Sequence, residues 1–282
     1  MSMETIRRLL RIVPDKPYLM LQFFYHFHRL PNLKSPKSFN EKLQWLKLYD
    51  RNPLYTKMVD KVEAKKYVAS IIGKEYIIPT IGVWQSAREI DFDLLPDRFV
   101  IKTNHDSKGV IVCKDKSKLD YSETRRFLCE QLRTNGYWYG RKWPYKNVKP
   151  RILAEEYLES PDGDLIDYKL MCFNGKVKCT FICTDRFTGK GLHVTFFDRN
   201  WNVMPFERSH PSLKNGYPKP KTYDEMVRLA ENLSKNMKFA RIDFYEVNGK
   251  IFFGEITLHP GSGLEAFQPI EWDYKLGSWL KL

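Results

Sequence analysis

Two Asn-Gly pairs, each flanked by residues of alternating polarity, constrain the fold of this chain more than any other sequence feature. Asn-Gly is a strong signature of the two-residue turn of a β-hairpin, because both residues adopt a positive φ readily. Antiparallel hairpins therefore form the centre of the fold that we expect. The strands predicted around the pairs at 174–175 and 248–249 are 168–173, 177–182, 241–247 and 250–256.

Shorter patterns surround these hairpins. Helices are predicted within 4–50, where a capping box stands at Ser38–Glu41, and then over 57–72, from Ser122, and over 223–237. Further strands are predicted at 76–78, 99–103, 110–113, 151–159, 193–197 and 201–204. Ser-Pro-Asp-Gly at 160–163 predicts a turn, and we place a boundary between two subdomains there. The predicted fold class is α+β.

The chain is strongly basic, with 47 Lys and Arg against 34 Asp and Glu, a net charge of +13 over 282 residues. Its 43% apolar and 15% aromatic content excludes a disordered chain. Basic proteins that bind nucleic acid often carry a Lys/Arg-rich tail of low complexity, and this sequence has none. We therefore expect no nucleic-acid partner and assign the surplus charge to another acidic ligand.

The cysteines and the lack of a long apolar run indicate the compartment. No run of 18 or more apolar residues is present, so we expect no transmembrane helix. The five cysteines form no CxxC pair, which favours a reduced, cytoplasmic chain without a disulfide frame or a structural zinc site. The aromatic stretch Tyr18–Phe27, with basic residues before it, either packs on the rest of the domain or rests on an anionic membrane.

Several common catalytic and nucleotide-binding motifs are absent from the sequence. It contains no G-x-x-x-x-G-K-[ST], no G-x-G-x-x-G, no G-x-S-x-G and no H-E-x-x-H. The chemistry must therefore reside in lysines, carboxylates and turns.

Polar residues alternate with apolar ones along the second hairpin. Arg241 and Asp243 share one face, and Glu255 and Thr257 also share a face with each other. A two-residue turn would place Asp243 and Glu255 on opposite faces. A three-residue loop with Gly249 in the left-handed bulge position would place them on the same face, and we predict this loop. Two such carboxylates suit Mg²⁺, and the alternative is a salt bridge between Arg241 and Glu255.

Lys102 lies in the middle of an apolar strand, where a lysine is costly to bury unless it is paired. Phosphate is a suitable partner, and the alternative is an edge lysine whose amine reaches water. The following loop, 105–109, can fold over phosphates as a lid. The Gly-Ser-Gly turn at 261–263 can present backbone N–H groups to an anion.

Taken in order, five segments resemble the ATP-grasp superfamily. They are DK at 60–61, FVIKTNHDSKGV at 99–110, ILAEEYL at 152–158, DYKLMCFNGKV at 167–177, and RIDFY with KIFFGEITLHPGSG within 241–263. The N-terminal part and the EITLHPGSG ending look like the TupA-like branch, named for teichuronopeptide biosynthesis. The resemblance implies two α+β subdomains that clamp ATP, at 57–159 and 160–282, after an N-terminal helical segment at 1–56.

The resemblance also implies roles by position. Lys61 and Lys102 match the lysines that contact the nucleotide phosphates. Lys169 matches a basic residue in the nucleotide cleft, and Arg241 matches the arginine that steadies the acyl-phosphate; we count both as catalytic. The hinge strand that reads adenine matches Glu155, Glu156, Tyr157 and Leu158. The Mg²⁺ ligands match Asp243, Glu255 and Thr257, the last in place of the usual asparagine, and we assign substrate contacts to His105, Lys108, His259 and Ser262.

These roles imply a carboxylate–amine ligase that uses ATP and Mg²⁺. The γ-phosphoryl group passes to a carboxylate, an amine attacks the acyl-phosphate, and phosphate leaves. Because the branch is associated with bacterial cell-surface polysaccharide, the expected substrates are an acidic carbohydrate or uronic acid and an amine or amino acid. The alternatives are a phosphotransferase acting on a glycan hydroxyl and an inert glycan-binding protein. We expect a cytoplasmic location, with peripheral contact at the anionic inner face of the cell membrane.

Overall fold

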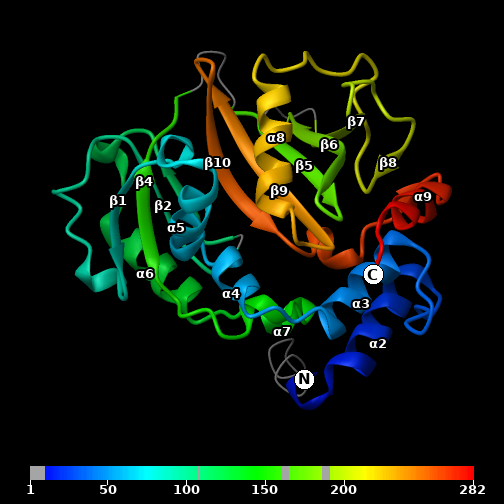
Figure 1. Ribbon diagram of the computed structural model, residues 1–282. Helices are drawn as coiled ribbons and strands as arrows, with labels where there is room; N and C mark the ends of the chain where they lie inside the picture. Colours follow the sequence, from blue (N-terminus) through cyan, green and yellow to red (C-terminus); the bar gives the residue numbers. More distant parts are fainter. Residues whose placement is uncertain (1–9, 107, 160–164, 186–190) are drawn as a thin grey trace.

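The computed structural model describes residues 10–106, 108–159, 165–185 and 191–282. Figure 1 shows two antiparallel sheets side by side with helices around them, which confirms the predicted α+β class. The four-stranded sheet has the order β1-β4-β2-β3, the five-stranded sheet has the order β10-β9-β5-β6-β7, and β8 pairs with β11. The strands are β1 Thr80–Trp84, β2 Phe99–Thr103, β3 Val110–Cys113, β4 Ile152–Glu156, β5 Asp167–Phe173, β6 Lys176–Thr184, β7 His193–Asp198, β8 Glu207–Arg208, β9 Phe239–Val247, β10 Lys250–Thr257 and β11 Phe267–Gln268.

Side-chain caps explain where several helices begin. The predicted capping box is present, since Ser38 Oγ accepts from Glu41 N and the Glu41 carboxylate accepts from Ser38 N, both at 3.2 Å. Asp120, and not the predicted Ser122, caps α6 by accepting from Glu123 N at 2.8 Å. The helices are α2 Asp15–Phe27, α3 Phe39–Tyr49, α4 Leu54–Val59, α5 Lys61–Ile72, α6 Tyr121–Leu132, α7 Tyr137–Gly140, α8 Tyr223–Ser234 and α9 Glu271–Trp279.

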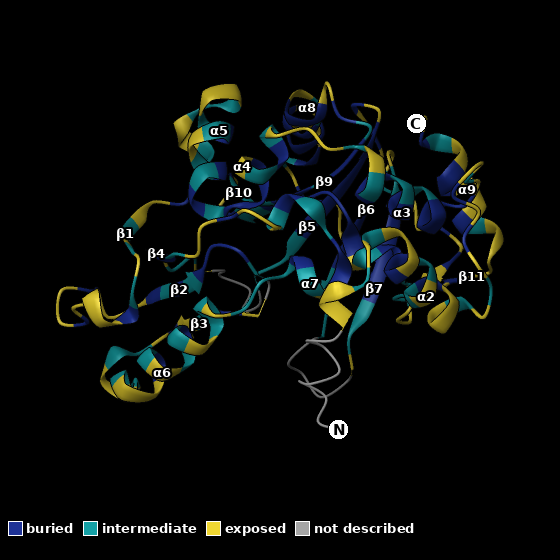
Figure 2. Cartoon of the chain, turned by 90° about the horizontal axis from the view of Figure 1, so that it is seen from below, coloured by how far each residue is buried: buried dark blue, intermediate teal, exposed yellow. Residues whose placement is uncertain are grey.

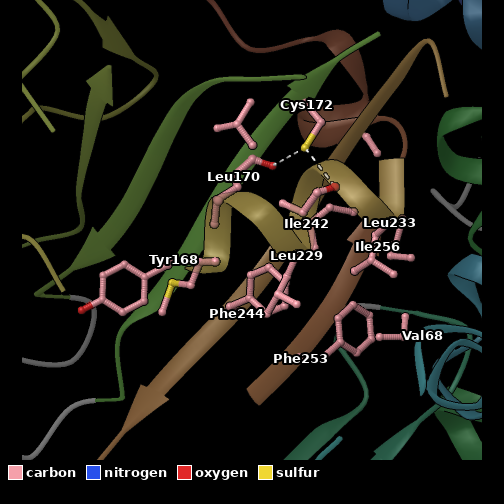
Figure 3. Close-up of a cluster of buried hydrophobic side chains, with 14 of the residues drawn as sticks. Val68, Tyr168, Leu170, Cys172, Leu229, Leu233, Ile242, Phe244, Phe253 and Ile256 are labelled. Atoms are coloured by element: carbon pink, nitrogen blue, oxygen red, sulfur yellow. Dashed lines mark hydrogen bonds between the residues drawn. The ribbon is translucent and has the colours of Figure 1, made fainter. Parts of the chain in front are cut away.

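The five-stranded sheet buries both of its faces. Along β5, Leu170 and Cys172 pack with α8 on one face, while Met171 and Phe173 pack with α3 and α9 on the other. The first cluster also takes in α4, α5 and inward residues of β9 and β10 (Figure 3). In Figure 2, the strands of this sheet are largely buried. An antiparallel strand that is covered on both sides is apolar at successive positions, as β5 is from Leu170 to Phe173.

The four-stranded sheet has a core of its own. Phe99 and Ile101 of β2 pack with Ile152 of β4 and with Leu128 of α6. The two sheets therefore hold separate hydrophobic clusters. The predicted domain boundaries after residues 56 and 159 stay predictions.

The predicted loop of the second hairpin is wrong. Asn248 and Gly249, with φ of 52° and 72°, form a two-residue turn, since Val247 pairs directly with Lys250. The register then shifts between Phe253 and Glu255, so the bulge lies at Gly254 instead of Gly249. One extra residue reverses the alternation of the strand. Glu255 therefore stands directly opposite Asp243, on the same face.

Smaller predictions also differ. Residues 76–78 form no strand: a 3₁₀ turn covers Lys74–Tyr76, and Ile77 makes an isolated bridge to Phe253. The strand of this region is β1, directly after Pro79. Within 201–204, only Val203 pairs, through an isolated bridge to Phe197. The predicted turn at 160–163 lies outside the described residues.

Two further observations concern membrane spans and cysteines. Among the described residues, no helix combines the length and the apolar character needed to span a membrane. The five cysteines all carry free thiols.

Candidate functional site

A cluster of charged side chains lies where β5, β9 and β10 run side by side. Arg241 donates from Nε to Asp243 Oδ1 at 2.7 Å and from Nη2 to Asp243 Oδ2 at 2.6 Å, and Nη2 also bonds Glu255 Oε1. Lys169 Nζ donates to Asp243 Oδ2 at 2.7 Å and to Asp167 Oδ2. We call these five residues the ion cluster. It joins two cations to three carboxylates.

Strand pairing builds the ion cluster. Lys169 pairs with Asp243 across β5 and β9, and Asp243 pairs with Glu255 across β9 and β10. Paired positions place their side chains on one face, so three adjacent strands each contribute a charged residue at the same level. Asp243 is 1% exposed, whereas 36% of the Glu255 side chain is exposed. Solvent therefore reaches the ion cluster at Glu255 but not at Asp243.

The members of the cluster stabilise one another's charges. Burial raises the pKa of Asp243, and contact with Arg241 and Lys169 opposes this shift. Burial also acts to raise the pKa of Glu255, but Arg241, Lys169 and Lys61 outweigh it and hold this pKa at about 2. Burial acts to lower the pKa of Lys169, yet Asp167 and Asp243 raise it. At neutral pH, Glu255 is therefore a carboxylate and Lys169 a cation.

The oxygen atoms of this region suit a hard divalent cation. Asp243 and Glu255 face each other from paired positions, and Thr257 Oγ1 donates to Glu255 Oε1 at 2.8 Å. Within the described residues, His, Cys, Asp and Glu form no group of three or more that could hold a metal, so the donor set is two carboxylates and a hydroxyl. Mg²⁺ takes such oxygen ligands. Its binding here would replace part of the contacts made by Arg241 and Lys169.

Asp167 was missed by the sequence analysis. Its Oδ1 atom is buried and has no hydrogen-bond partner among the described residues. A buried acceptor without a partner is costly, which marks this oxygen as a position for a ligand donor or a cation. The alternation of polar residues at 167 and 169, ahead of the apolar run of β5, is the sequence feature that would have revealed it.

On the four-stranded sheet, the buried carboxylate of Glu155 lies between two lysines. It binds Lys65 Nζ at 2.6 Å and also binds Lys102 Nζ. Burial acts to raise the pKa of Glu155, but Lys102 and Lys65 together lower it. Lys102 was predicted to contact the phosphates of ATP and Glu155 to contact its adenine. In the structure these two side chains form an ion pair with each other. Lys65 was missed, although it follows Lys61 by one helical turn, a spacing that places both amines on one side of the helix.

Lys61 connects the two sheets. Its Nζ bonds the backbone oxygen of Asp106, in the loop after β2. Burial lowers the pKa of Lys61, and the negative charge of Glu255 opposes that shift. Within the loop, the Asp106 carboxylate accepts from Gly109 N at 2.9 Å and from Thr103 Oγ1 at 2.8 Å. The described residues of the expected lid thus surround the Asp106 carboxylate and bond α5, while residue 107 lies outside the described part of the chain.

Lys61 and Glu255 line the same small hollow, together with Tyr145. Its volume is about 10 Å³, which is room for about one water molecule. A triphosphate needs more space than this. Nucleotide binding between Lys61 and Glu255 therefore requires this hollow to widen.

Three more residues were predicted, with Glu155, to contact adenine, and all three lie outside the ion cluster. Glu156 is exposed, Leu158 is half-buried, and the guanidinium of Arg98 lies 5.6 Å from the centre of the Tyr157 ring. No hydrogen bond or ion pair joins these three side chains to the ion cluster within the described part of the chain. Their predicted contact with adenine stays a prediction.

The predicted substrate residues of the lid differ in exposure. His105 is buried, with Nδ1 3.2 Å from Asn104 Oδ1 and Nε2 3.1 Å from the backbone oxygen of Thr134. Burial lowers the pKa of His105. Lys108 is exposed. His105 therefore anchors the start of the loop, and Lys108 is the member accessible to a ligand.

The loop after β10 is held by α3. Lys47 Nζ donates to Ser262 O at 2.7 Å and to Ser262 Oγ at 3.1 Å, while Gln44 Nε2 donates to Gly263 O at 2.7 Å. His259 is buried, its Nδ1 has no partner among the described residues, and burial lowers its pKa well below the usual value. Sequence analysis missed Gln44 and Lys47. Polar residues interleaved with the leucines of a predicted helix are the signal that could have found them.

Solved structures of ligases and synthetases share similarity with this chain. A D-alanine–D-alanine ligase from Bacillus anthracis has 16% sequence identity and a TM-score of 0.42, over 73% of this chain and 58% of that one. One from Helicobacter pylori has 14% identity and a TM-score of 0.45, over 87% and 70%. N5-carboxyaminoimidazole ribonucleotide synthetase, in complex with ADP, has 13% identity and a TM-score of 0.43, over 78% and 51%. The chain thus spans little more than half the length of the first and third.

The sequence itself gives the family. No curated protein matches it. A family model described as TupA-like ATPgrasp matches residues 41–281, a span that holds both sheets and the whole ion cluster. The match confirms the resemblance found in the sequence. The chain therefore belongs to the TupA-like ATP-grasp family.

Proposed function

We propose that this protein is an ATP-dependent ligase that joins a carboxylate to an amine through an acyl-phosphate. The observation that carries the proposal is the ion cluster with Lys61 beside it, since cations and carboxylates from three strands and a helix meet there. Phosphoryl transfer requires little covalent chemistry from a protein. It requires cations around the phosphates and fixed positions for the reactants, which this arrangement supplies.

Each charged side chain has a role in the proposed reaction. Lys61 and Lys102 bind the phosphates of ATP. Asp243 and Glu255 hold Mg²⁺, which offsets phosphate charge when it is bound. Arg241, already bonded to both carboxylates, stabilises the oxygen that gains negative charge when the amine attacks.

The substrate class that we propose is an acidic carbohydrate, such as a uronic acid of a bacterial surface polysaccharide or its precursor. The second substrate is an amine or amino acid. Positive charge beyond the phosphate lysines supports an acidic substrate. Lys142 lies near Glu255 and Arg241, and burial lowers its pKa.

Product analysis by mass spectrometry tests this function. The protein is incubated with ATP, Mg²⁺ and a panel of uronic acids and amino acids. Formation of an amide together with ADP and free phosphate supports ligation. A phosphorylated carbohydrate without free phosphate would assign a phosphotransferase instead. Carbohydrate binding without any ADP formation would identify an inert binding protein.

Matched lysine variants complete the test. Lys102→Met removes the cation bonded to Glu155, so turnover should fall at least about a hundredfold, the range seen for a lost charge-stabilising group. Lys114 is exposed and serves as the control, and Lys114→Met should keep full turnover. Equal turnover by both variants would contradict the role of Lys102.

A further inference from the structure

Helix α2 is apolar on two opposite faces. Leu19 and Phe23, one turn apart, are fully buried on its inner face. Leu21, Phe24 and Tyr25 are 60%, 49% and 78% exposed. Their i, i+3 and i+4 spacing gathers these three side chains on the outer face. A surface helix of a globular protein usually carries polar residues there, so this face requires a separate explanation.

The inner face of α2 is firmly attached to the domain. The guanidinium of the buried Arg141 lies 4.4 Å from the centre of the Tyr18 ring and donates to Val13 O at 3.1 Å. Gln22 Nε2 donates to the backbone oxygen of Tyr139 at 2.9 Å. The helix is therefore anchored through one side, and its outer side chains are held facing outward.

The exposed apolar surface continues beyond both ends of the helix. Ile12 is 82% exposed and Leu30 is 58% exposed. We call Ile12, Leu21, Phe24, Tyr25 and Leu30 the α2 face. In Figure 2, α2 lies at the periphery of the molecule and shows exposed residues along its length. A patch of several large apolar side chains on one surface marks a site of contact with another apolar body.

Basic residues accompany the α2 face. Residues 10–37 contain five basic side chains, at Arg11, Lys16, Arg29, Lys34 and Lys37, against a single acidic one at Asp15; of the five, Arg29 pairs with Glu41 at 2.6 Å. Asp15 is already engaged, since it accepts from the Tyr137 hydroxyl at 2.5 Å and from Arg51 at 3.2 Å. The surroundings of the α2 face are therefore positively charged.

We propose that the α2 face docks the protein on an anionic lipid bilayer. Leucine, phenylalanine and tyrosine side chains enter the boundary between headgroups and acyl chains, while lysines attract the anionic headgroups. A second copy of the chain is disfavoured as the occupant, because two positively charged faces would oppose each other. Through α3, whose Gln44 and Lys47 hold the loop at 262–263, the docked helix adjoins the candidate site.

Vesicle sedimentation tests the apolar part of the proposal. Wild-type protein should sediment with vesicles of phosphatidylcholine and phosphatidylglycerol and much less with phosphatidylcholine alone. The triple variant Leu21→Ser, Phe24→Ser, Tyr25→Ser should partition at least about tenfold less, because it removes apolar area. A control variant changes exposed apolar residues outside α2, Ile71→Thr, Val83→Thr and Leu94→Ser, and should bind like wild type.

Charge reversal tests the lipid class independently of the apolar side chains. Lys16→Glu, Lys34→Glu and Lys37→Glu should weaken binding at least about tenfold, because basic residues near an anionic surface attract its headgroups. Lys66→Glu, Lys114→Glu and Lys214→Glu change the net charge equally at exposed positions elsewhere and should have much less effect. If both variants lost vesicle binding equally, the net charge of the protein and not the α2 face would explain the binding, and the proposal would be overturned.

Two other results would also overturn it. Wild-type protein that stays in the supernatant with anionic vesicles at low salt has no such surface. Concentration-dependent dimerisation that the Leu21 triple variant abolishes, without vesicle binding, would assign the α2 face to a second copy. Unchanged circular dichroism and thermal midpoints of the variants would establish that any lost binding comes from the surface and not from unfolding.

Discussion

Replacing Asp243 by Asn removes a charge while keeping the size of the side chain. Asp243 accepts two bonds from Arg241, at 2.7 and 2.6 Å, and one from Lys169 at 2.7 Å. Breaking a buried ion pair costs about 3–5 kcal/mol. Arg241 keeps its contact with Glu255 and Lys169 keeps Asp167, so we expect the low end, about 3 kcal/mol. An unfolding entropy of about 2.1 cal/mol/K per residue, over 282 residues, is about 0.6 kcal/mol/K, so the thermal midpoint should fall by about 5 °C.

Thermal unfolding with and without Mg-ATP measures both consequences of this substitution. At a hundred times its Kd, a ligand adds about 2.7 kcal/mol, so Mg-ATP should raise the wild-type midpoint by about 4–5 °C. Asp243→Asn should lower the midpoint and abolish the Mg-ATP shift. The control is Asp224→Asn, since the Asp224 side chain is 87% exposed and pairs with Lys219 at the surface, where the loss is below about 1 kcal/mol. A variant that melts like wild type and keeps the full Mg-ATP shift would refute the reasoning.

Three further predictions concern Lys102, the two glycines of the second hairpin and Glu255. Lys102→Ala should abolish the Mg-ATP shift; a retained shift would exclude this lysine from the phosphates. Gly254→Ala places a Cβ 3.2 Å from Asp243 O, so it should weaken Mg-ATP binding, whereas Gly249→Ala, with open space but a φ of 72°, should cost about 1 kcal/mol of stability and leave binding intact. The pKa of Glu255 is lowered to about 2, so its charge contributes stability above pH 4.5 that is lost as the pH falls toward 2. Urea unfolding across this range should show a smaller acid loss for Glu255→Gln, and identical profiles would contradict the shift.

The sequence predicted those parts of the fold whose signals are local. The Asn-Gly turn at 174–175 and the capping box at Ser38 each specify their own geometry within a few residues. The sequence also holds a signal for the bulge at Gly254. The residues that pack into the core have odd numbers before it, at Ile251 and Phe253, and even numbers after it, at Ile256 and Leu258. Figure 3 shows Phe253 and Ile256 in one cluster. The prediction failed because it placed the extra residue in the turn, where glycine is also common.

The contacts of the lysines could not be predicted, because their partners are distant in the sequence. Lys47 bonds Ser262, which lies 215 residues further on. Lys102 meets Glu155 because β4 lies beside β2 in the sheet, and Lys65 reaches the same carboxylate from α5. Residue types and spacing reveal that a lysine on an apolar face needs a partner. They do not reveal which partner the fold supplies.

The bulge at Gly254 has a consequence for solubility. Strand β10 is the outermost strand of the five-stranded sheet, and an outermost strand can pair with the strand of another molecule. A bulge interrupts the regular row of backbone donors and acceptors, and a charged side chain beside it opposes such pairing. Deleting Gly254 would restore a continuous ladder and turn Glu255 toward the opposite face. The residue that aligns the two carboxylates therefore also interrupts the outer edge of the sheet, which Ile77 already covers at Phe253 through an isolated bridge.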